Sequence, residues 1–266
     1  MSGTPSHLEI LSCLPQGAAR ATPLLFVHGA YAGAWCWDDH FLSYFASHGW
    51  SAHAVSLSGH GGSAGREHLD ALSIDDYVND VREAIASLPA RPVLVGHSMG
   101  GLVVQKLLEH EDVPGVVLMC SVPPGGLAMA AAGLLFQRPA MLLDLNRVLG
   151  GGQPHLDTLR EALFHQPVTP EVLQSCFLRM QPESMRAVWD MTLFALPSPA
   201  RMYRPPMLIL GAEHDTLIPA RQVVDTGETY GVQAEIFADM GHGLMLERDW
   251  RQVADRIREW LDEQGY

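Results

Sequence analysis

A short apolar run that leads directly into a glycine–serine–glycine turn and then a helix constrains the fold of this chain more than any other feature. Residues 93–95 are Val-Leu-Val, Gly96-His97-Ser98-Met99-Gly100-Gly101 follows at once, and residues 102–109 have the character of a helix. A G-x-S-x-G pattern between a strand and a helix is typical of a very sharp turn that presents the serine hydroxyl at the carboxyl end of a sheet. An ordinary glycine-rich turn is the alternative, and the strand and helix on either side disfavour it. We therefore predict that Ser98 is a nucleophile on such an elbow.

Apolar strands alternate with amphipathic helices along much of the rest of the chain. We predict further strands over 24–27, 51–56, 116–119, 207–210 and 234–237. Helices are predicted over 38–48, after a capping-box-like start at Ser73, and over 249–261. Strands that are apolar throughout and are joined by helices indicate a mostly parallel sheet covered on both faces, which is an α/β architecture.

The alternation stops between the strands at 116–119 and 207–210. Residues 123–204 contain no convincing strand and are rich in Leu, Met, Ala and Pro. We predict that they form several short helices, inserted as a cap or lid into a core domain made of residues 1–122 and 205–266. A Met-rich insertion of this kind can be plain core, a pliable apolar cover for the serine, or both.

The chain also carries a candidate base and a candidate acid in the expected places. A serine hydroxyl is a weak nucleophile until a base removes its proton. In α/β folds whose serine lies on a sharp turn of this kind, the acid and then the histidine follow the serine along the chain. Asp215 follows the strand at 207–210, and His242, flanked by glycines, follows the strand at 234–237. We predict that His242 is the general base and that Asp215 orients it. His214 is an alternative base, and Glu213 and Asp239 are alternative acids.

Catalysis at a carbonyl also needs donors for the negative charge that develops on its oxygen. The backbone amide of Met99, directly after the nucleophile, is the first predicted donor of this oxyanion hole. The second is expected in the loop after the strand that ends in His28-Gly29. Ala30 is the preferred residue there, and Tyr31 is the alternative.

Composition narrows the function further. The formal net charge of −13 disfavours nucleic acid and anionic membrane surfaces as partners. The four cysteines are scattered without metal-ligand spacing, and no H-E-x-x-H motif or phosphate loop is present, so we expect no metal and no cofactor. We see no signal peptide and no transmembrane segment, and we expect a cytoplasmic monomer or homodimer.

Five segments, taken in order, resemble the α/β-hydrolase family over nearly the whole chain: His28-Gly29-Ala30, Ser58-Gly59-His60-Gly61-Gly62-Ser63, Gly96-His97-Ser98-Met99-Gly100-Gly101, Gly211-Ala212-Glu213-His214-Asp215 and Gly241-His242. The third segment is similar to monoacylglycerol lipases and small carboxylesterases, and residues 28–37 are similar to plant methylesterases and hydroxynitrile lyases. The resemblance implies an eight-stranded, mostly parallel sheet with a helical cap after the sixth strand.

Two features of the sequence narrow the reactions that this resemblance allows. Lyases of that branch carry a lysine after the catalytic histidine, where this chain has Gly243, and epoxide hydrolases and haloalkane dehalogenases use an aspartate where Ser98 stands. We therefore predict a serine hydrolase, carboxylesterase-like or lipase-like, that cleaves a small apolar carboxylic ester through an acyl-enzyme. The alternatives are carbon–carbon bond hydrolysis or cofactor-free perhydrolysis on the same triad, and a ligand-binding receptor on a hydrolase scaffold.

Overall fold

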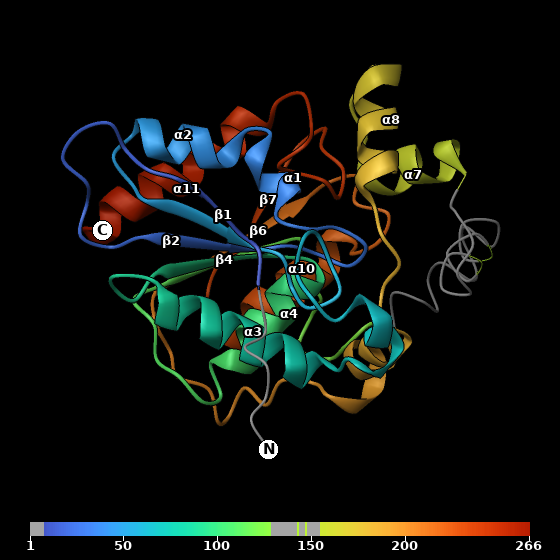
Figure 1. Ribbon diagram of the computed structural model, residues 1–266, viewed down its shortest axis with the longest axis horizontal. Helices are drawn as coiled ribbons and strands as arrows, with labels where there is room; N and C mark the ends of the chain where they lie inside the picture. The colour runs from blue at the N-terminus through green and yellow to red at the C-terminus, as the bar shows by residue number, and fades with distance from the viewer. Residues whose placement is uncertain (1–7, 129–142, 144–146, 148–154) are drawn as a thin grey trace.

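A seven-stranded sheet forms the centre of the protein in the computed structural model, which describes residues 8–128, 143, 147 and 155–266 (Figure 1). The strand order is β1-β3-β2-β4-β5-β6-β7, and all neighbours are parallel except β1, which pairs antiparallel with β3. The strands are β1 (Ile10–Cys13), β2 (Leu24–Val27), β3 (Ala52–Val55), β4 (Val93–His97), β5 (Val116–Met119), β6 (Met207–Ala212) and β7 (Glu235–Phe237). Parallel order brings the loops that follow β2 to β7 to one edge of the sheet.

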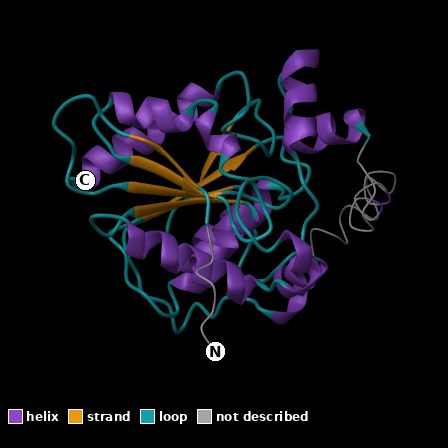
Figure 2. Cartoon of the chain, viewed as in Figure 1, coloured by secondary structure: helices purple, strands orange, loops and turns teal. Residues whose placement is uncertain are grey.

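Helices cover both faces of the sheet (Figure 2). One face carries α1 (Trp35–Asp38), α2 (Phe41–Ser47) and α11 (Trp250–Gln264), and the other carries α3 (Ile74–Ser87), α4 (Met99–Leu107) and α10 (Ala220–Tyr230) (Figure 1). Side chains of each strand alternate between the two layers: Leu24 and Phe26 pack with the first set, and Leu25 and Val27 with the second. This two-sided burial explains why β2, β3, β4 and β5 are apolar along almost their whole length.

The α/β fold class predicted from the sequence is confirmed, and each of the six strands located in the sequence is present. The capping box is also present, because the Ser73 hydroxyl accepts a hydrogen bond from the Asp76 amide and the Asp76 carboxylate accepts one from the Ser73 amide. The predicted strand count of eight is corrected to seven among the described residues. The sequence analysis missed β1, which is a four-residue edge strand that pairs on one side only and is half-buried, so it lacks a continuous apolar run.

The inserted segment lies between β5 and β6, so it follows the fifth described strand and not the sixth as the resemblance implied. It contains α7 (Leu156–Leu163), α8 (Pro170–Arg179), α9 (Met185–Trp189) and the π-helical turn η2 (Asp190–Phe194), and no strand occurs in its described residues. Residues 129–142, 144–146 and 148–154 of the predicted cap lie outside the described residues. No helix in the described ranges combines the length and the apolar character needed to cross a membrane.

Candidate active site

Ser98 lies on a sharp turn between β4 and α4. Strand β4 ends at His97, α4 begins at Met99, and Ser98 between them has φ 53° and ψ −119°. Residues other than glycine rarely adopt this backbone conformation, and the conformation persists only where the surrounding structure holds it. Here the Ser98 amide donates to Met119 O at 3.0 Å, and Ser98 O accepts from the Val122 amide at 3.1 Å. The end of β5 therefore holds the strained serine in place.

The glycines on either side of Ser98 are required by close backbone packing. A Cβ atom on Gly100 would lie 2.4 Å from the carbonyl oxygens of both Val27 and His28. A Cβ atom on Gly96 would lie 2.7 Å from Gly100 O. The G-x-S-x-G pattern thus reflects how closely α4 approaches the neighbouring strands β2 and β4 as the chain turns.

Asp215 and His242 come together in a buried hydrogen bond. Asp215 follows β6, His242 follows β7, and the His242 Nδ1–H donates to Asp215 Oδ2 at 2.7 Å. The other carboxylate oxygen, Oδ1, accepts from the amides of Leu217 and Ile218, each at 2.8 Å. Both side chains are almost fully buried. Because an ionised carboxylate only accepts hydrogen bonds, the proton of a neutral His242 ring lies on Nδ1 and Nε2 is left with a free lone pair.

His97 links the serine turn to the loop that carries His242. Its Nε2–H donates to His242 O at 2.9 Å, and the two rings are 4.6 Å apart between centroids. Burial, with a smaller contribution from His242, lowers the pKa of His97 well below its ordinary value, so the ring is neutral. No hydrogen bond joins the Ser98 hydroxyl to His242 among the described residues. The two residues are linked indirectly, because His97 precedes Ser98 in the chain and contacts His242.

The loop after β2 lies against Ser98. A Cβ atom on Gly29 would lie 3.0 Å from Ser98 Cβ, so the Gly29–Ala30 peptide passes directly beside the serine. His28 holds that peptide: its Nδ1–H donates to Gly29 O at 2.8 Å, and its Nε2 accepts from the Leu57 amide at 3.0 Å. Burial lowers the pKa of His28 to about 3, which keeps the ring neutral for both bonds. Because Gly29 O and the Ala30 N–H belong to one planar peptide, fixing the oxygen fixes the direction of the N–H.

The alternative acids and the alternative base lie on the surface. Glu213 Oε2 accepts from the Asp239 amide at 3.2 Å, and neither side chain is bonded to His242. The ring of His214 stacks on that of His165, with 3.7 Å between centroids, and is partly exposed. The geometry brings Asp215, and none of these three residues, to His242.

The sequence analysis missed the role of Glu247 at this edge of the sheet. The carboxylate is buried, and its Oε1 accepts from the amides of Gly241 and His165, each at 2.7 Å. Burial raises the pKa of Glu247 above its ordinary range, although these hydrogen bonds oppose the rise. Gly243 N also donates to Leu163 O at 2.7 Å. The loop that carries His242 is therefore fastened to itself through Glu247 and to the end of α7 through Leu163 and His165, and no sequence pattern marks these contacts.

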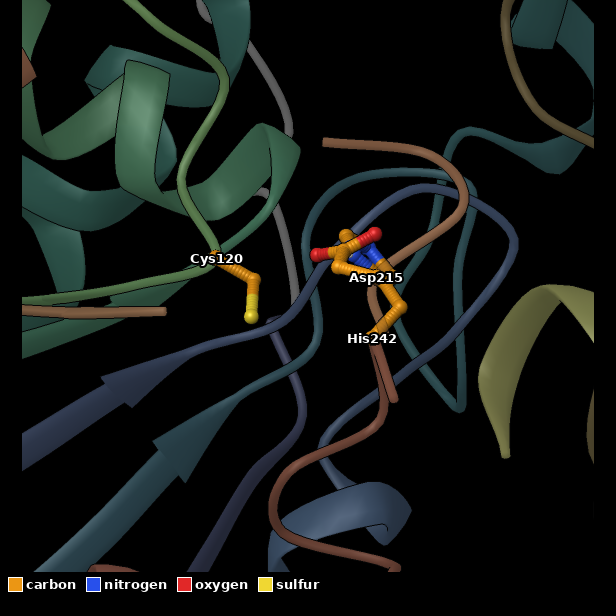
Figure 3. A group of neighbouring side chains, drawn as sticks. All are labelled: Cys120, Asp215 and His242. Carbon is orange, nitrogen blue, oxygen red and sulfur yellow. The ribbon is translucent and has the colours of Figure 1, made fainter. Parts of the chain in front are cut away.

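Two groups of side chains bring metal-ligating atoms together among the described residues. In the first, the Cys120 thiol approaches Asp215 and His242, with all three ligand atoms within 4.8 Å of one another (Figure 3). Burial, followed by the Asp215 charge, raises the pKa of this thiol well above its ordinary value, so the sulfur is protonated and a poor ligand. A metal there would also compete with His242 for Asp215. In the second group, His165, His214 and Asp239 meet at the exposed surface.

Comparison with known proteins identifies the family. The family model described as the alpha/beta hydrolase family matches residues 24–256 of the chain. The chain belongs to the α/β-hydrolase family. This α/β hydrolase is 28% identical to a pyrethroid hydrolase of Sphingobium wenxiniae over 103 residues, which are 38% of this chain and 36% of that protein. It is 33% identical to methyl jasmonate esterase 1 of Vitis vinifera over 111 residues, which are 40% of this chain and 41% of that protein. The matched stretch thus spans less than half the length of either relative.

Solved structures of similar shape cover the chain more completely. A thermophilic esterase from Thermogutta terrifontis superimposes with a TM-score of 0.71 and 19% identity, covering 100% of this α/β hydrolase and 97% of that chain. At this identity the likeness establishes the fold alone. The relatives that share this fold and parts of this sequence include esterases.

Proposed function

We propose that this α/β hydrolase is a serine esterase that cleaves carboxylic esters through an acyl-enzyme, with Ser98 as nucleophile, His242 as base and Asp215 as the acid that orients the base. The observation that carries the proposal is the buried Asp215–His242 hydrogen bond beside the strained Ser98 turn. A histidine whose Nδ1–H is bound to a carboxylate has Nε2 free to take a serine proton. The esterase names among its relatives favour ester substrates.

The reaction follows from these groups. Ser98 Oγ forms a bond to the carbonyl carbon of the ester while His242 Nε2 takes the hydroxyl proton, and the Asp215 carboxylate stabilises the resulting imidazolium. The carbon–oxygen bond of the leaving alcohol then breaks, and the alkoxide takes that proton from His242. In the second half, His242 takes a proton from water, the water oxygen attacks the acyl carbon, and Ser98 recovers its proton as the acid leaves.

The amides of Ala30 and Met99 are proposed as donors to the oxyanion. Neither amide donates a hydrogen bond elsewhere among the described residues, so both N–H groups are free for a ligand. Met99 is also the first residue of α4, where the helix dipole favours negative charge. Tyr31, the alternative donor, has its amide engaged with Glu183 Oε2 at 3.3 Å, which favours Ala30.

An apolar substrate group is proposed from the surface of the segment between β5 and β6. Among the described residues, eight of the nine large hydrophobic side chains that are exposed belong to residues 123–204, and Leu14 is the exception. A concentration of exposed apolar side chains favours an apolar ligand or lipid-like group nearby. We further propose that residues 123–204 form a helical cap on a core of residues 1–122 and 205–266. Cytoplasmic location and a monomeric or homodimeric state stay predictions.

A fluorophosphonate probe and a chain-length series test the proposal together. We expect the probe to label the wild type and not Ser98→Ala, and we expect p-nitrophenyl esters from acetate to decanoate to be hydrolysed with loss of activity in the same variant. A perhydrolysis assay with hydrogen peroxide and acetate, run in parallel, tests the alternative reaction on the same triad. Absence of both labelling and turnover in the wild type would overturn the esterase and favour a ligand-binding protein on this scaffold.

A further inference from the structure

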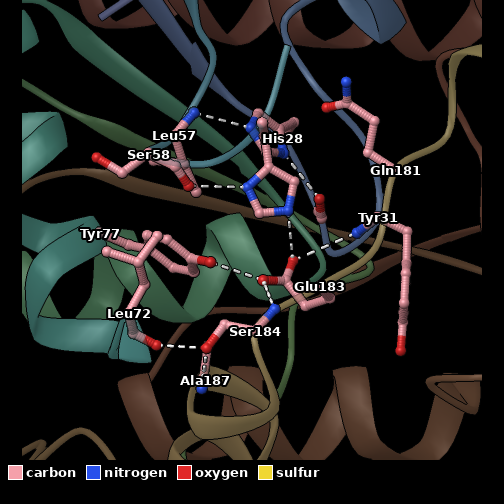
Figure 4. Close-up of polar contacts among 12 residues, drawn as sticks. His28, Tyr31, Leu57, Ser58, Leu72, Tyr77, Gln181, Glu183, Ser184 and Ala187 are labelled. Atoms are coloured by element: carbon pink, nitrogen blue, oxygen red, sulfur yellow. Dashed lines mark hydrogen bonds and ion pairs between the residues drawn. The ribbon is translucent and has the colours of Figure 1, made fainter. Parts of the chain in front are cut away.

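A buried carboxylate from the segment between β5 and β6 reaches into the core behind the loop that follows β2. Glu183 Oε1 accepts from the Tyr77 hydroxyl and from the Ser184 amide, each at 2.7 Å. Its other oxygen, Oε2, lies 3.1 Å from His60 Nε2 and 3.3 Å from the Tyr31 amide (Figure 4). The side chains of Glu183 and His60 are completely buried. Four groups from four parts of the chain thus converge on one carboxylate.

The charge on this carboxylate is compensated inside the protein. Burial is the largest influence and alone would raise the pKa of Glu183, but His60 together with the hydrogen bonds from Tyr77 and Ser184 outweighs it, and the pKa is lowered. Burial likewise opposes the charge on His60, while Glu183 raises its pKa. The Nδ1 of His60 faces the Ser58 carbonyl at 3.1 Å, so both ring nitrogens lie close to acceptors, an arrangement that favours the imidazolium. The two side chains form an ion pair, and removing one charge leaves the other buried without a counter-charge.

The ion pair holds a strained residue next to the proposed oxyanion donor. Tyr31 has φ 64°, which is a left-handed conformation that a tyrosine adopts only where its surroundings impose it. Its amide donates to Glu183 Oε2, and its carbonyl accepts from the Gln181 amide at 3.0 Å. Residues 181–183 therefore grip Tyr31 on both sides. Ala30 precedes Tyr31 directly, so this grip and the His28 bond to Gly29 O hold the Ala30 peptide from opposite ends.

We propose that Glu183 is a positioning residue that keeps the Ala30 amide aimed at the oxyanion by clamping Tyr31 in its left-handed conformation. The proposal rests on the proposed esterase function and extends it: the segment between β5 and β6 supplies part of the support of the oxyanion hole. Glu183 touches no reacting atom and acts through Tyr31. Binding of the substrate ground state depends little on that amide, whereas the tetrahedral transition state depends on it strongly.

Glu183→Gln tests this inference because it keeps the shape of the side chain and removes its charge. Losing one oxyanion donor outright lowers kcat by roughly 100-fold to 1,000-fold, so loosening one is expected to lower kcat by about 10-fold to 100-fold. We expect KM for p-nitrophenyl butyrate to stay within about threefold of the wild-type value. The inhibition constant of an alkyl trifluoromethyl ketone, which adds to the serine as a tetrahedral hemiketal, should weaken by the same factor as kcat/KM.

Glu109→Gln is the matched control, because Glu109 is also a buried carboxylate in an ion pair, with Lys106 and Arg201. Glu109→Gln should lower the stability of the protein without changing the ratio of the ketone inhibition constant to KM. If Glu183→Gln does not fold, Tyr77→Phe removes one hydrogen bond from Glu183 and should lower kcat by at least about threefold, again with KM maintained.

A Glu183→Gln enzyme with wild-type kcat, or one that loses kcat with unchanged ketone affinity, would overturn the inference. The same holds for an unchanged kcat in Tyr77→Phe. These outcomes differ from failure of the proposed function, in which the wild type itself shows no turnover and no Ser98 labelling.

Discussion

Replacing Asp215 with asparagine tests the geometry of the proposed triad most sharply, because the surroundings decide which way the new amide faces. In the wild type, Oδ1 accepts from the amides of Leu217 and Ile218, and Oδ2 accepts from His242 Nδ1–H. If the asparagine NH₂ faced the two backbone amides, two buried donors would lose their acceptor, at about 1–3 kcal/mol each. Facing His242 instead, the NH₂ conflicts with one donor only. We therefore expect the asparagine oxygen to stay on the backbone amides and its NH₂ to face the imidazole.

That orientation changes the tautomer of His242. The NH₂ group needs an acceptor, so Nδ1 gives up its proton and Nε2 carries it, which leaves no lone pair directed at Ser98. A triad locked in the wrong tautomer loses roughly 10⁴-fold in kcat. Converted at 1.36 kcal/mol for each tenfold change, the barrier rises by about 5.5 kcal/mol. The fold should be little affected, because the shape of the side chain and its hydrogen bonds from the Leu217 and Ile218 amides are kept.

The assay is hydrolysis of p-nitrophenyl butyrate at neutral pH, with Ser98→Ala as the background and a thermal melt to verify folding. Glu213→Gln serves as the control, because Glu213 is the exposed neighbouring acid and should retain activity within about twofold. The reasoning is refuted if Asp215→Asn stays within tenfold of the wild type while His242→Ala is inactive. In that case another group orients the base.

Two further predictions concern stability. Gly100→Ala places a Cβ atom 2.4 Å from the backbone oxygen of Val27, which cannot move without disturbing β2, so we expect a loss of about 3 kcal/mol or more in urea unfolding. Gly125→Ala, at an exposed glycine with open space around it, should stay within about 0.5 kcal/mol, and equal losses in both variants would contradict the clash. Burial raises the pKa of Asp80 to about 6, so the folded state binds the proton more tightly than the unfolded chain and stability falls as pH rises from about 4 to about 6. In Asp80→Asn, the amide oxygen can accept from the Ser58 amide and the NH₂ can donate to the Ser58 hydroxyl oxygen. The stability of this variant relative to wild type should increase by up to roughly 3 kcal/mol over that range, and a difference that does not vary with pH would argue against a raised pKa.

Local patterns in the sequence were sufficient to predict six of the seven described strands and the places of the loops that carry the candidate site residues. The apolar strand β4, the glycines around Ser98 and the start of α4 follow one another without interruption, so their structure depends mostly on near neighbours. Asp215 and His242 could be placed because each follows a parallel strand, and parallel strands end at one edge of the sheet. Strand β1 could not be predicted in this way, since its four residues are half-buried and pair with one neighbour only.

The hydrogen bonds that hold the candidate site in place could not be predicted from the sequence, for a different reason. Glu183 meets the Tyr31 amide across 152 residues of chain, and Glu247 meets the His165 amide across 82. A carboxylate that accepts from a backbone amide leaves no mark on the sequence of the segment that donates, because every residue except proline has such an amide. The position of His97 inside the G-x-S-x-G motif was visible, but its bond to His242 O depends on how two distant loops meet.

The contacts of the segment between β5 and β6 bear on any attempt to alter substrate range by transplanting this region from another hydrolase. The backbone amides of residues 165 and 166 donate hydrogen bonds to Glu247. The stretch from Gln181 to Ser184 is hydrogen-bonded to the loop after β2 and to Tyr77. A chimera that replaces the whole insertion would discard these anchors together with the apolar surface. A smaller graft confined to residues 167–180, which include α8, would leave both anchors native and should yield folded, active hybrids more often.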